Sequence, residues 1–159
     1  MKRVLLFLLS LLLAFFSLFS CGEEDFFVPF RGGFVAEVQV TLGELAFAAE
    51  ICREVDAEGG DRVTVTFYAP TELAGTVLCR TPTGDTVTAE GLTVEGGAWC
   101  DALLSLLLPR EDVKKIAVTD TGRTRVDGDG YSFEFLSDGT PVAVKTDTVV
   151  ADIVRFEVK

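Results

Sequence analysis

The chain has 159 residues, of which 48% are hydrophobic, and it carries a formal net charge of −11 with no histidine. So acidic a chain is a poor candidate for a nucleic-acid-binding protein, because phosphate binding depends on clusters of lysine and arginine. The absence of histidine removes the commonest general base and metal ligand. Once an N-terminal leader is set aside, the remaining length suits one domain with a sizeable core.

The first 21 residues predict an export signal that ends in a lipid anchor. Lys2 and Arg3 precede an apolar run over residues 4–19, and Ser20 and Cys21 follow it. A basic head, an apolar stretch and a small residue before the cut are the parts of a secretory signal. The segment Leu18-Phe19-Ser20-Cys21 resembles the processing site of bacterial lipoproteins, which implies cleavage after Ser20 and acylation of Cys21, typically with palmitate. A retained helix is the alternative, since the apolar run is close to the roughly 20 residues that span a bilayer.

This start of the chain predicts location and domain organisation. Residues 1–20 are expected to be the signal peptide, residues 21–33 the lipidated cysteine and a tether, and residues 34–159 a single β-rich domain. The predicted location is extracytoplasmic, on the outer face of the cytoplasmic membrane, or on the outer membrane in a cell that has one. Phe26, Phe27 and Phe30 lie in the tether. We expect them to dock onto the domain, because a free apolar cluster would otherwise stay exposed.

The cysteines form an odd set once Cys21 is lipidated. Cys52, Cys79 and Cys100 remain, so at most one disulfide can form within the chain, and the sequence leaves open whether it does. Their spacing matches no zinc motif. Three small hydrophobic side chains packed in a core are favoured over a redox role.

Alternating apolar and polar residues predict a series of short strands joined by tight turns. Residues 44–55 fit both a strand and one face of a helix; we favour the strand, because a Gly-rich turn at 58–61 then leads into the clear strand at 63–68. The last strand is apolar on both faces at its start, which predicts a sheet covered on both sides. The expected strands are residues 34–41, 44–55, 63–68, 76–80, 86–94, 116–118, 124–126, 131–135, 142–145 and 149–158.

One helix interrupts the strands, at residues 98–108. Only Asp101 and Ser105 are polar in it, so it must be buried on most sides. At 1.5 Å per residue it is about 16 Å long, too short to cross a bilayer. The predicted fold is therefore mainly β: a curved antiparallel sheet, or unclosed barrel, with the apolar helix packed in its concavity. A helix lying on a membrane surface is the alternative, and residues 111–115 are expected to add a short turn.

No group of residues predicts catalysis. The segment Asp127-Gly128-Asp129-Gly130 has part of a calcium-loop pattern but runs directly into a strand, so a hairpin turn is favoured. Asp101 and Asp152 interrupt apolar patterns, and partial exposure or an ion pair with an arginine such as Arg155 is favoured for each over a buried functional carboxylate. A cysteine and an aspartate without histidine do not make a nucleophile. We expect neither enzyme activity nor a metal or cofactor.

The layout resembles a group of envelope proteins, the lipoprotein localisation factors A and B and the mycobacterial lipid-carrier lipoproteins. The residues that carry the resemblance are the strand 63–68 running into Pro70, the apolar helix and the closing hairpins. The chain also resembles small uncharacterised lipoproteins of Gram-positive bacteria. The resemblance implies an unclosed barrel with helices over an apolar concavity, but fold alone does not fix function.

Two non-catalytic functions follow as hypotheses. In the first, the domain carries or senses a lipid or other hydrophobic ligand between sheet and helix. In the second, the core is filled and the domain binds a protein partner. An internal cavity of several hundred Å³ would separate them. The expected ligand lining is Phe67, Trp99, Leu103, Leu104, Leu106, Leu107, Phe133 and Phe135.

Overall fold

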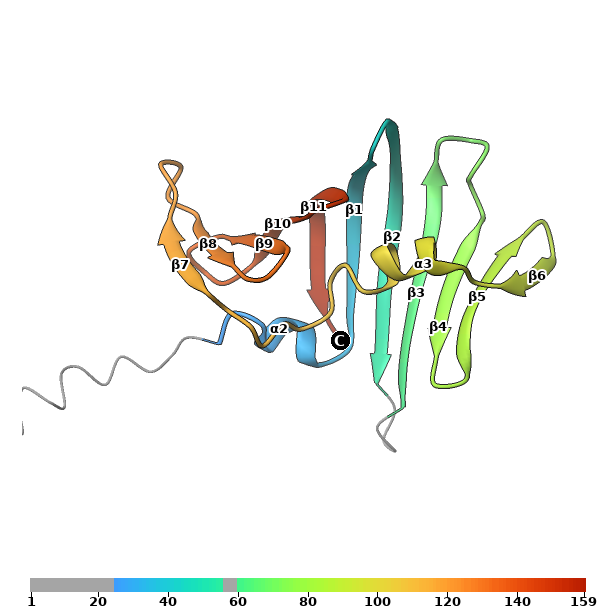
Figure 1. The fold of residues 1–159 in the computed structure, drawn as a ribbon, viewed down its shortest axis with the longest axis horizontal. Helices are drawn as coiled ribbons and strands as arrows, with labels where there is room; N and C mark the ends of the chain where they lie inside the picture. Colours follow the sequence, from blue (N-terminus) through green and yellow to red (C-terminus); the bar gives the residue numbers. More distant parts are fainter. Residues whose placement is uncertain (1–24, 56–59) are drawn as a thin grey trace, which may run out of the picture.

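A computed structural model describes residues 25–55 and 60–159. The expected signal peptide, the expected lipidation site at Cys21 and part of the expected turn at 58–61 lie outside the described residues. In the described part, eleven strands form one antiparallel sheet and two short helices accompany it (Figure 1). This is the predicted fold class. The sheet is strongly curled, with β7–β10 at a steep angle to β1–β6.

The strands follow the predicted alternation in number and place, with one exception treated below. The helices are α2 (Val28–Arg31) and α3 (Ala98–Leu104). The strands are β1 (Phe34–Leu42), β2 (Leu45–Val55), β3 (Asp61–Ala69), β4 (Val77–Thr81), β5 (Gly84–Ala89), β6 (Leu92–Glu95), β7 (Lys115–Val118), β8 (Thr124–Asp127), β9 (Tyr131–Phe135), β10 (Pro141–Thr146) and β11 (Val149–Val158). Residues 44–55 are thus the strand that the sequence favoured.

The first and last strands pair at the middle of the sheet. The order is β6-β5-β4-β3-β2-β1-β11-β10-β9-β8-β7, and Phe34 of β1 lies opposite Val158 of β11. Two meanders, β1–β6 and β7–β11, are therefore joined along one seam, and β6 and β7 are the free edges. The connection between those edges, residues 96–114, crosses one face of the sheet and contains α3 (Figure 1).

One face of the sheet is apolar and buried beneath that connection. In β1, Phe34, Ala36, Val38 and Val40 are buried while the residues between them are exposed or half-buried. The same alternation in β2, β3 and β9 adds to the core. Strands with this period place every second side chain on one face, so the buried face is the concave one, toward α3.

The last strand is covered on one face only, which corrects the predicted double cover. Val149, Ala151 and Ile153 are buried, whereas Val150 is 44% and Val154 is 61% exposed. The register between β1 and β11 shifts at this point, because Val38 pairs with Ile153 but Glu37 pairs with Arg155. Val154 is therefore the extra residue of a β-bulge, which turns Phe156 toward the core after it.

The single strand expected at 86–94 is wrong. The structure has the hairpin β5–β6 there, and Ala89 pairs with Leu92 across its turn. The two turn residues, Glu90 and Gly91, have φ of 50° and 80°. Positive φ at both central positions is the requirement of a two-residue hairpin turn, and glycine meets it without steric cost.

The apolar helix is shorter than expected. It ends at Leu104, where the Ser105 hydroxyl donates a hydrogen bond to the carbonyl of Asp101. Leu106 and Leu107 continue as irregular turns and are nevertheless buried. Residues 111–114 have no regular structure, so the turn expected there is wrong. A hydroxyl that bonds the backbone four residues earlier competes with helix continuation, and Pro109 prevents it further on.

Candidate functional site

The concave face of the sheet is filled by side chains. Of the eight expected lining residues, Phe67, Leu103, Leu104, Leu106, Leu107, Phe133 and Phe135 belong to one core cluster and are at most 4% exposed. Trp99 is 53% exposed and lies outside that cluster. The structure therefore brings seven of the eight together as packed core. Their role as a ligand lining remains a prediction.

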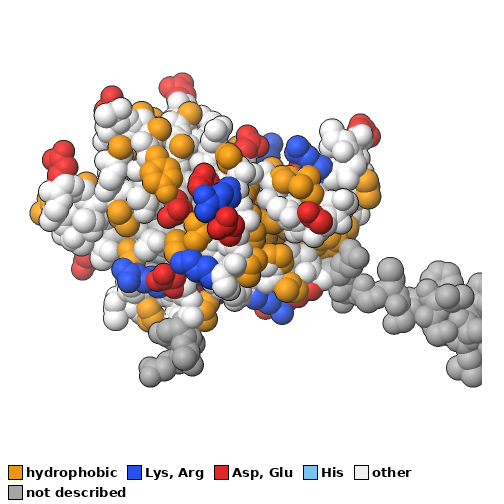
Figure 2. All heavy atoms as spheres, turned by 180° about the vertical axis from the view of Figure 1, so that it is seen from behind, with side chains coloured by type: hydrophobic (Ala, Val, Ile, Leu, Met, Phe, Trp, Pro, Cys, Tyr) orange, Lys and Arg blue, Asp and Glu red, His pale blue; other side chains and the backbone are white. Residues whose placement is uncertain are grey.

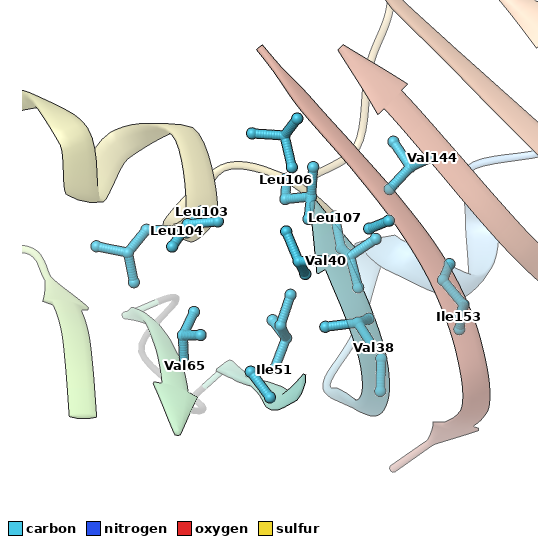
Figure 3. Close-up of a cluster of buried hydrophobic side chains, with 14 of the residues drawn as sticks. Val38, Val40, Ile51, Val65, Leu103, Leu104, Leu106, Leu107, Val144 and Ile153 are labelled. Carbon is cyan, nitrogen blue, oxygen red and sulfur yellow. The ribbon is translucent and has the colours of Figure 1, made fainter. Parts of the chain in front are cut away.

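The leucines after Trp99 fill the space between sheet and crossing segment. Figure 3 shows Leu103, Leu104, Leu106 and Leu107 pointing toward strand residues such as Val40, Ile51 and Val65. α3 packs on β3 and β4. Interdigitated apolar side chains of this kind reach crystal-like density, which leaves little free space.

The α2 segment packs at one end of the concave face. This agrees with the prediction that the phenylalanines of the tether dock onto the domain. Phe27 is 2% exposed and Phe30 fully buried. The Phe27 and Phe30 rings lie 5.2 and 5.4 Å from the ring of Phe133, and Phe30 lies 5.1 Å from Phe156. Arg53 donates a hydrogen bond to the carbonyl of Phe30. These are offset and edge-to-face distances typical of stabilising aromatic pairs, so α2 is part of the core.

A groove of about 470 Å³ runs between α2 and the strand β7. It is lined by the apolar side chains of Phe26, Phe27, Val113 and Ile116 and by the charged side chains of Asp25, Arg31, Arg110 and Glu111. A second groove of about 390 Å³ shares Asp25 and Phe26 with the first and includes Val28 and Leu136. Both fall within the size of small-molecule sites. Sequence reasoning missed them, because the position of α2 beside β7 follows from tertiary packing alone.

An arginine holds α3 against the sheet. Arg80 of β4 pairs with Asp85 of β5 and with Asp101 of α3, each at 2.7 Å. The hydrogen bond from Arg80 lowers the pKa of Asp85, and the two carboxylates raise the pKa of Arg80. Asp101 thus makes an ion pair at an exposed position, and Asp152 is exposed. Neither is a buried functional carboxylate.

The three described cysteines are free, and they occupy two different environments. Cys100 is fully buried, which raises the pKa of its thiol. Cys52 and Cys79 are only half-buried, so the expectation of three core thiols is right for Cys100 alone. Both lie opposite Thr64 on its two neighbouring strands, roughly 10 Å apart at about 4.8 Å per strand. A disulfide needs Cα atoms within about 7 Å, so these two are too far apart.

The outer face of the sheet is mixed in character. Figure 2 shows apolar side chains scattered among acidic and basic groups there. Arg155 pairs with Glu37 at 2.9 Å and with Glu157 at 3.0 Å, and Lys159 reaches Glu54 at 3.3 Å. Exposed pairs of this kind contribute little to stability.

The described residues contain no cluster of three or more acidic or cysteine side chains placed to hold a metal ion. Asp127–Gly130 connects β8 to β9 as the expected hairpin turn. Within residues 25–55 and 60–159, neither helix has the length and hydropathy needed to cross a bilayer.

Comparison with known proteins identifies the fold. No protein-family model and no curated protein sequence matches the chain. An uncharacterized conserved protein from Thermus thermophilus is similar in structure, with a TM-score of 0.54, 14% identity, and 82% and 81% of the two chains covered. MucB is similar with a TM-score of 0.52 and 12% identity; the alignment covers 88% of this chain but only 60% of MucB. A LolA superfamily protein from Nitrosomonas europaea matches at a TM-score of 0.43 and 6% identity, over 86% and 91% of the chains. The resemblance expected from the sequence is confirmed as a likeness of fold.

Proposed function

We propose that the chain is a lipid-anchored, non-catalytic binding module of the cell envelope that recognises a protein partner. One observation carries this choice between the two hypotheses: the concave face is occupied by the chain's own leucines and phenylalanines. A carrier needs free space to enclose an acyl chain, whereas a protein-binding module with this fold does not. MucB, which is similar in fold, is known in complex with MucA, which supports a protein partner by analogy of fold only.

Native mass spectrometry of the chain as it is extracted from cell membranes in mild detergent tests this proposal. The expected mass is that of the acylated chain without further lipid. In parallel, a photoreactive benzoylphenylalanine at Val94 or Ile116 on the two free edge strands, which are 51% and 53% exposed, should give one discrete protein adduct in cells. Val154, at the bulge on the outer face, provides the control position. Stoichiometric bound lipid without any protein adduct would contradict the proposal.

A hydrophobic ligand in the groove beside α2 is the second candidate. The groove is lined by both apolar and charged side chains, which suits an amphiphile with a polar head. Palmitate is a suitable probe. Ile116→Glu should abolish its binding, because Ile116 lines the groove, while Val118→Glu on the same exposed strand should not. Equal palmitate binding by both variants would exclude the groove as the site.

The lipid anchor is a separate part of the proposal. Cys21→Ala removes the acylated thiol, and two or three acyl chains are what hold such a protein firmly. The variant should be released from the membrane fraction into the medium or periplasm. Persistent membrane association would indicate that an uncleaved N-terminal helix is the anchor.

A further inference from the structure

A polar hollow of about 430 Å³ lies between α3 and the turn that joins β10 to β11, and it shares only Arg110 with the groove between α2 and β7. Hydroxyl, carboxylate and guanidinium groups dominate its lining. The lining residues are Ala98, Asp101, Ala102, Ser105, Arg110, Asp129, Gly130, Tyr131, Thr146, Asp147 and Thr148. Neither hypothesis drawn from the sequence uses this hollow.

Two buried hydrogen-bond donors at this hollow have no partner. They are the hydroxyl of Tyr131, a residue only 7% exposed, and Nε of Arg110. Arg110 is held in place because Nη2 donates to the carbonyl of Ser105 at 3.2 Å and its guanidinium lies 5.5 Å from the centre of the Tyr131 ring. A buried donor without a partner costs about 1–3 kcal/mol. An incoming acceptor oxygen that reached these groups would recover that cost.

The turn before Tyr131 is built to hold the ring in this position. A Cβ on Gly128 would lie 2.1 Å from the Tyr131 ring, so only glycine leaves room for it. Burial, with the Asp112 carboxylate nearby, raises the pKa of Tyr131 to about 12, although Asp112 makes no well-formed hydrogen bond to the hydroxyl. The hydroxyl therefore stays protonated at any physiological pH and can donate a hydrogen bond.

The rim of the hollow is acidic, and one of its carboxylates is not neutralised. Asp101 pairs with Arg80 at 2.7 Å and Asp129 with Lys114 at 3.0 Å. Asp147 makes no ion pair with any described residue, and its carboxylate lies against Gly130, next to Tyr131 in sequence. A cationic group placed at Asp147 would gain from this charge, while the Arg110 guanidinium of the same hollow favours an acceptor oxygen beside it.

We propose that this hollow binds a lysine or arginine side chain from an extended segment of a protein partner. Its cation would lie at Asp147, and a backbone carbonyl of the same segment would accept hydrogen bonds from Tyr131 and Arg110. The identification of the ligand as a protein segment rests on the proposed function. The preference of the hollow for a cation beside an acceptor oxygen is independent of that function.

The test is a titration of the isotope-labelled full-length chain in detergent micelles, followed by amide NMR signals. The probes are N-acetyl-lysine amide, its uncharged analogue N-acetyl-norleucine amide, and n-butylammonium, which has the cation without the carbonyl. We expect saturable shifts at Gly130, Tyr131 and Thr148 with the lysine amide. Binding by either other probe should be at least fivefold weaker, a factor that corresponds to about one lost polar interaction.

Variants separate the two halves of the recognition. Asp147→Asn should reduce affinity for the lysine amide at least fivefold without affecting its carbonyl contact, and Tyr131→Phe should do the same while keeping the ring in place. Asp120→Asn, at an exposed turn between β7 and β8, is the matched control and should bind normally. Unchanged thermal midpoints establish that the variants fold. Equal binding of the norleucine amide, or of the Asp147→Asn chain, would overturn the proposal. If the lysine amide binds but the cross-linking experiment finds no protein partner, the binding chemistry of the hollow is supported and the proposed function is wrong.

Discussion

Replacement of Phe30 by alanine tests whether α2 belongs to the cooperative core. Phe30 is fully buried, and its ring lies within 6.4 Å of the rings of five other phenylalanines. Truncation of a buried phenylalanine to alanine costs about 3–5 kcal/mol, through lost burial and the cavity left behind. With a urea m-value of about 2 kcal/mol/M, a loss of about 4 kcal/mol lowers the midpoint of unfolding by about 2 M.

The measurement is urea unfolding followed by circular dichroism, with Val28→Ala as the control. Val28 lies in the same short helix but is 60% exposed, so its truncation should change stability by no more than about 0.5 kcal/mol. If Phe30→Ala were no more destabilising than Val28→Ala, α2 would be an appendage that docks on an independently stable domain. The core assignment of the aromatic cluster would then be wrong.

Three further predictions concern the core and its ion pairs. Gly128→Ala should destabilise the fold by about 1–3 kcal/mol, because the new Cβ would meet the Tyr131 ring at 2.1 Å; Gly32→Ala, with open space around it, should be nearly neutral in the same thermal melt. In a chain with Cys52→Ser and Cys79→Ser, Cys100 should react with a thiol reagent only as the protein unfolds, because it is buried and burial raises the pKa of its thiol; rapid reaction in the native state would contradict its burial. The pKa of Asp85 is lowered in the folded state, so its contribution to stability is present above the unfolded value near 3.8 and is lost as the pH falls through the lower folded value. Asp85→Asn should therefore flatten the dependence of stability on pH below about pH 4, and an unchanged slope there would refute the pairing with its arginine.

Local patterns predicted most of the strands, because a period of two is written directly in the sequence of a half-buried strand. They failed where local chemistry competes with the pattern. Residues 86–94 alternate well enough to hide the turn at Glu90 and Gly91, and the bulge at Val154 changes the phase of the last strand. Neither the turn nor the bulge alters the composition of its segment, so neither can be recognised from hydrophobic periodicity.

The candidate site was harder to predict than the fold. The leucines of residues 103–107 read equally well as ligand lining and as core, and only the three-dimensional packing distinguishes free space from filled space. Trp99 was predicted to line the ligand site with the leucines of the same helix, but it is largely exposed. The polar hollow beside Tyr131 combines residues from α3, the β8–β9 turn and the β10–β11 turn. No sequence pattern links segments so far apart.

The seam between β1 and β11 has a consequence for how the chain acquires its structure. Residues separated by more than a hundred positions, such as Glu37 and Arg155, must meet before the sheet is continuous. Such distant pairings slow folding, because the entropy of closing a long loop is lost before any contact repays it. A growing polypeptide with this topology cannot complete its core until β11, its last strand, has emerged.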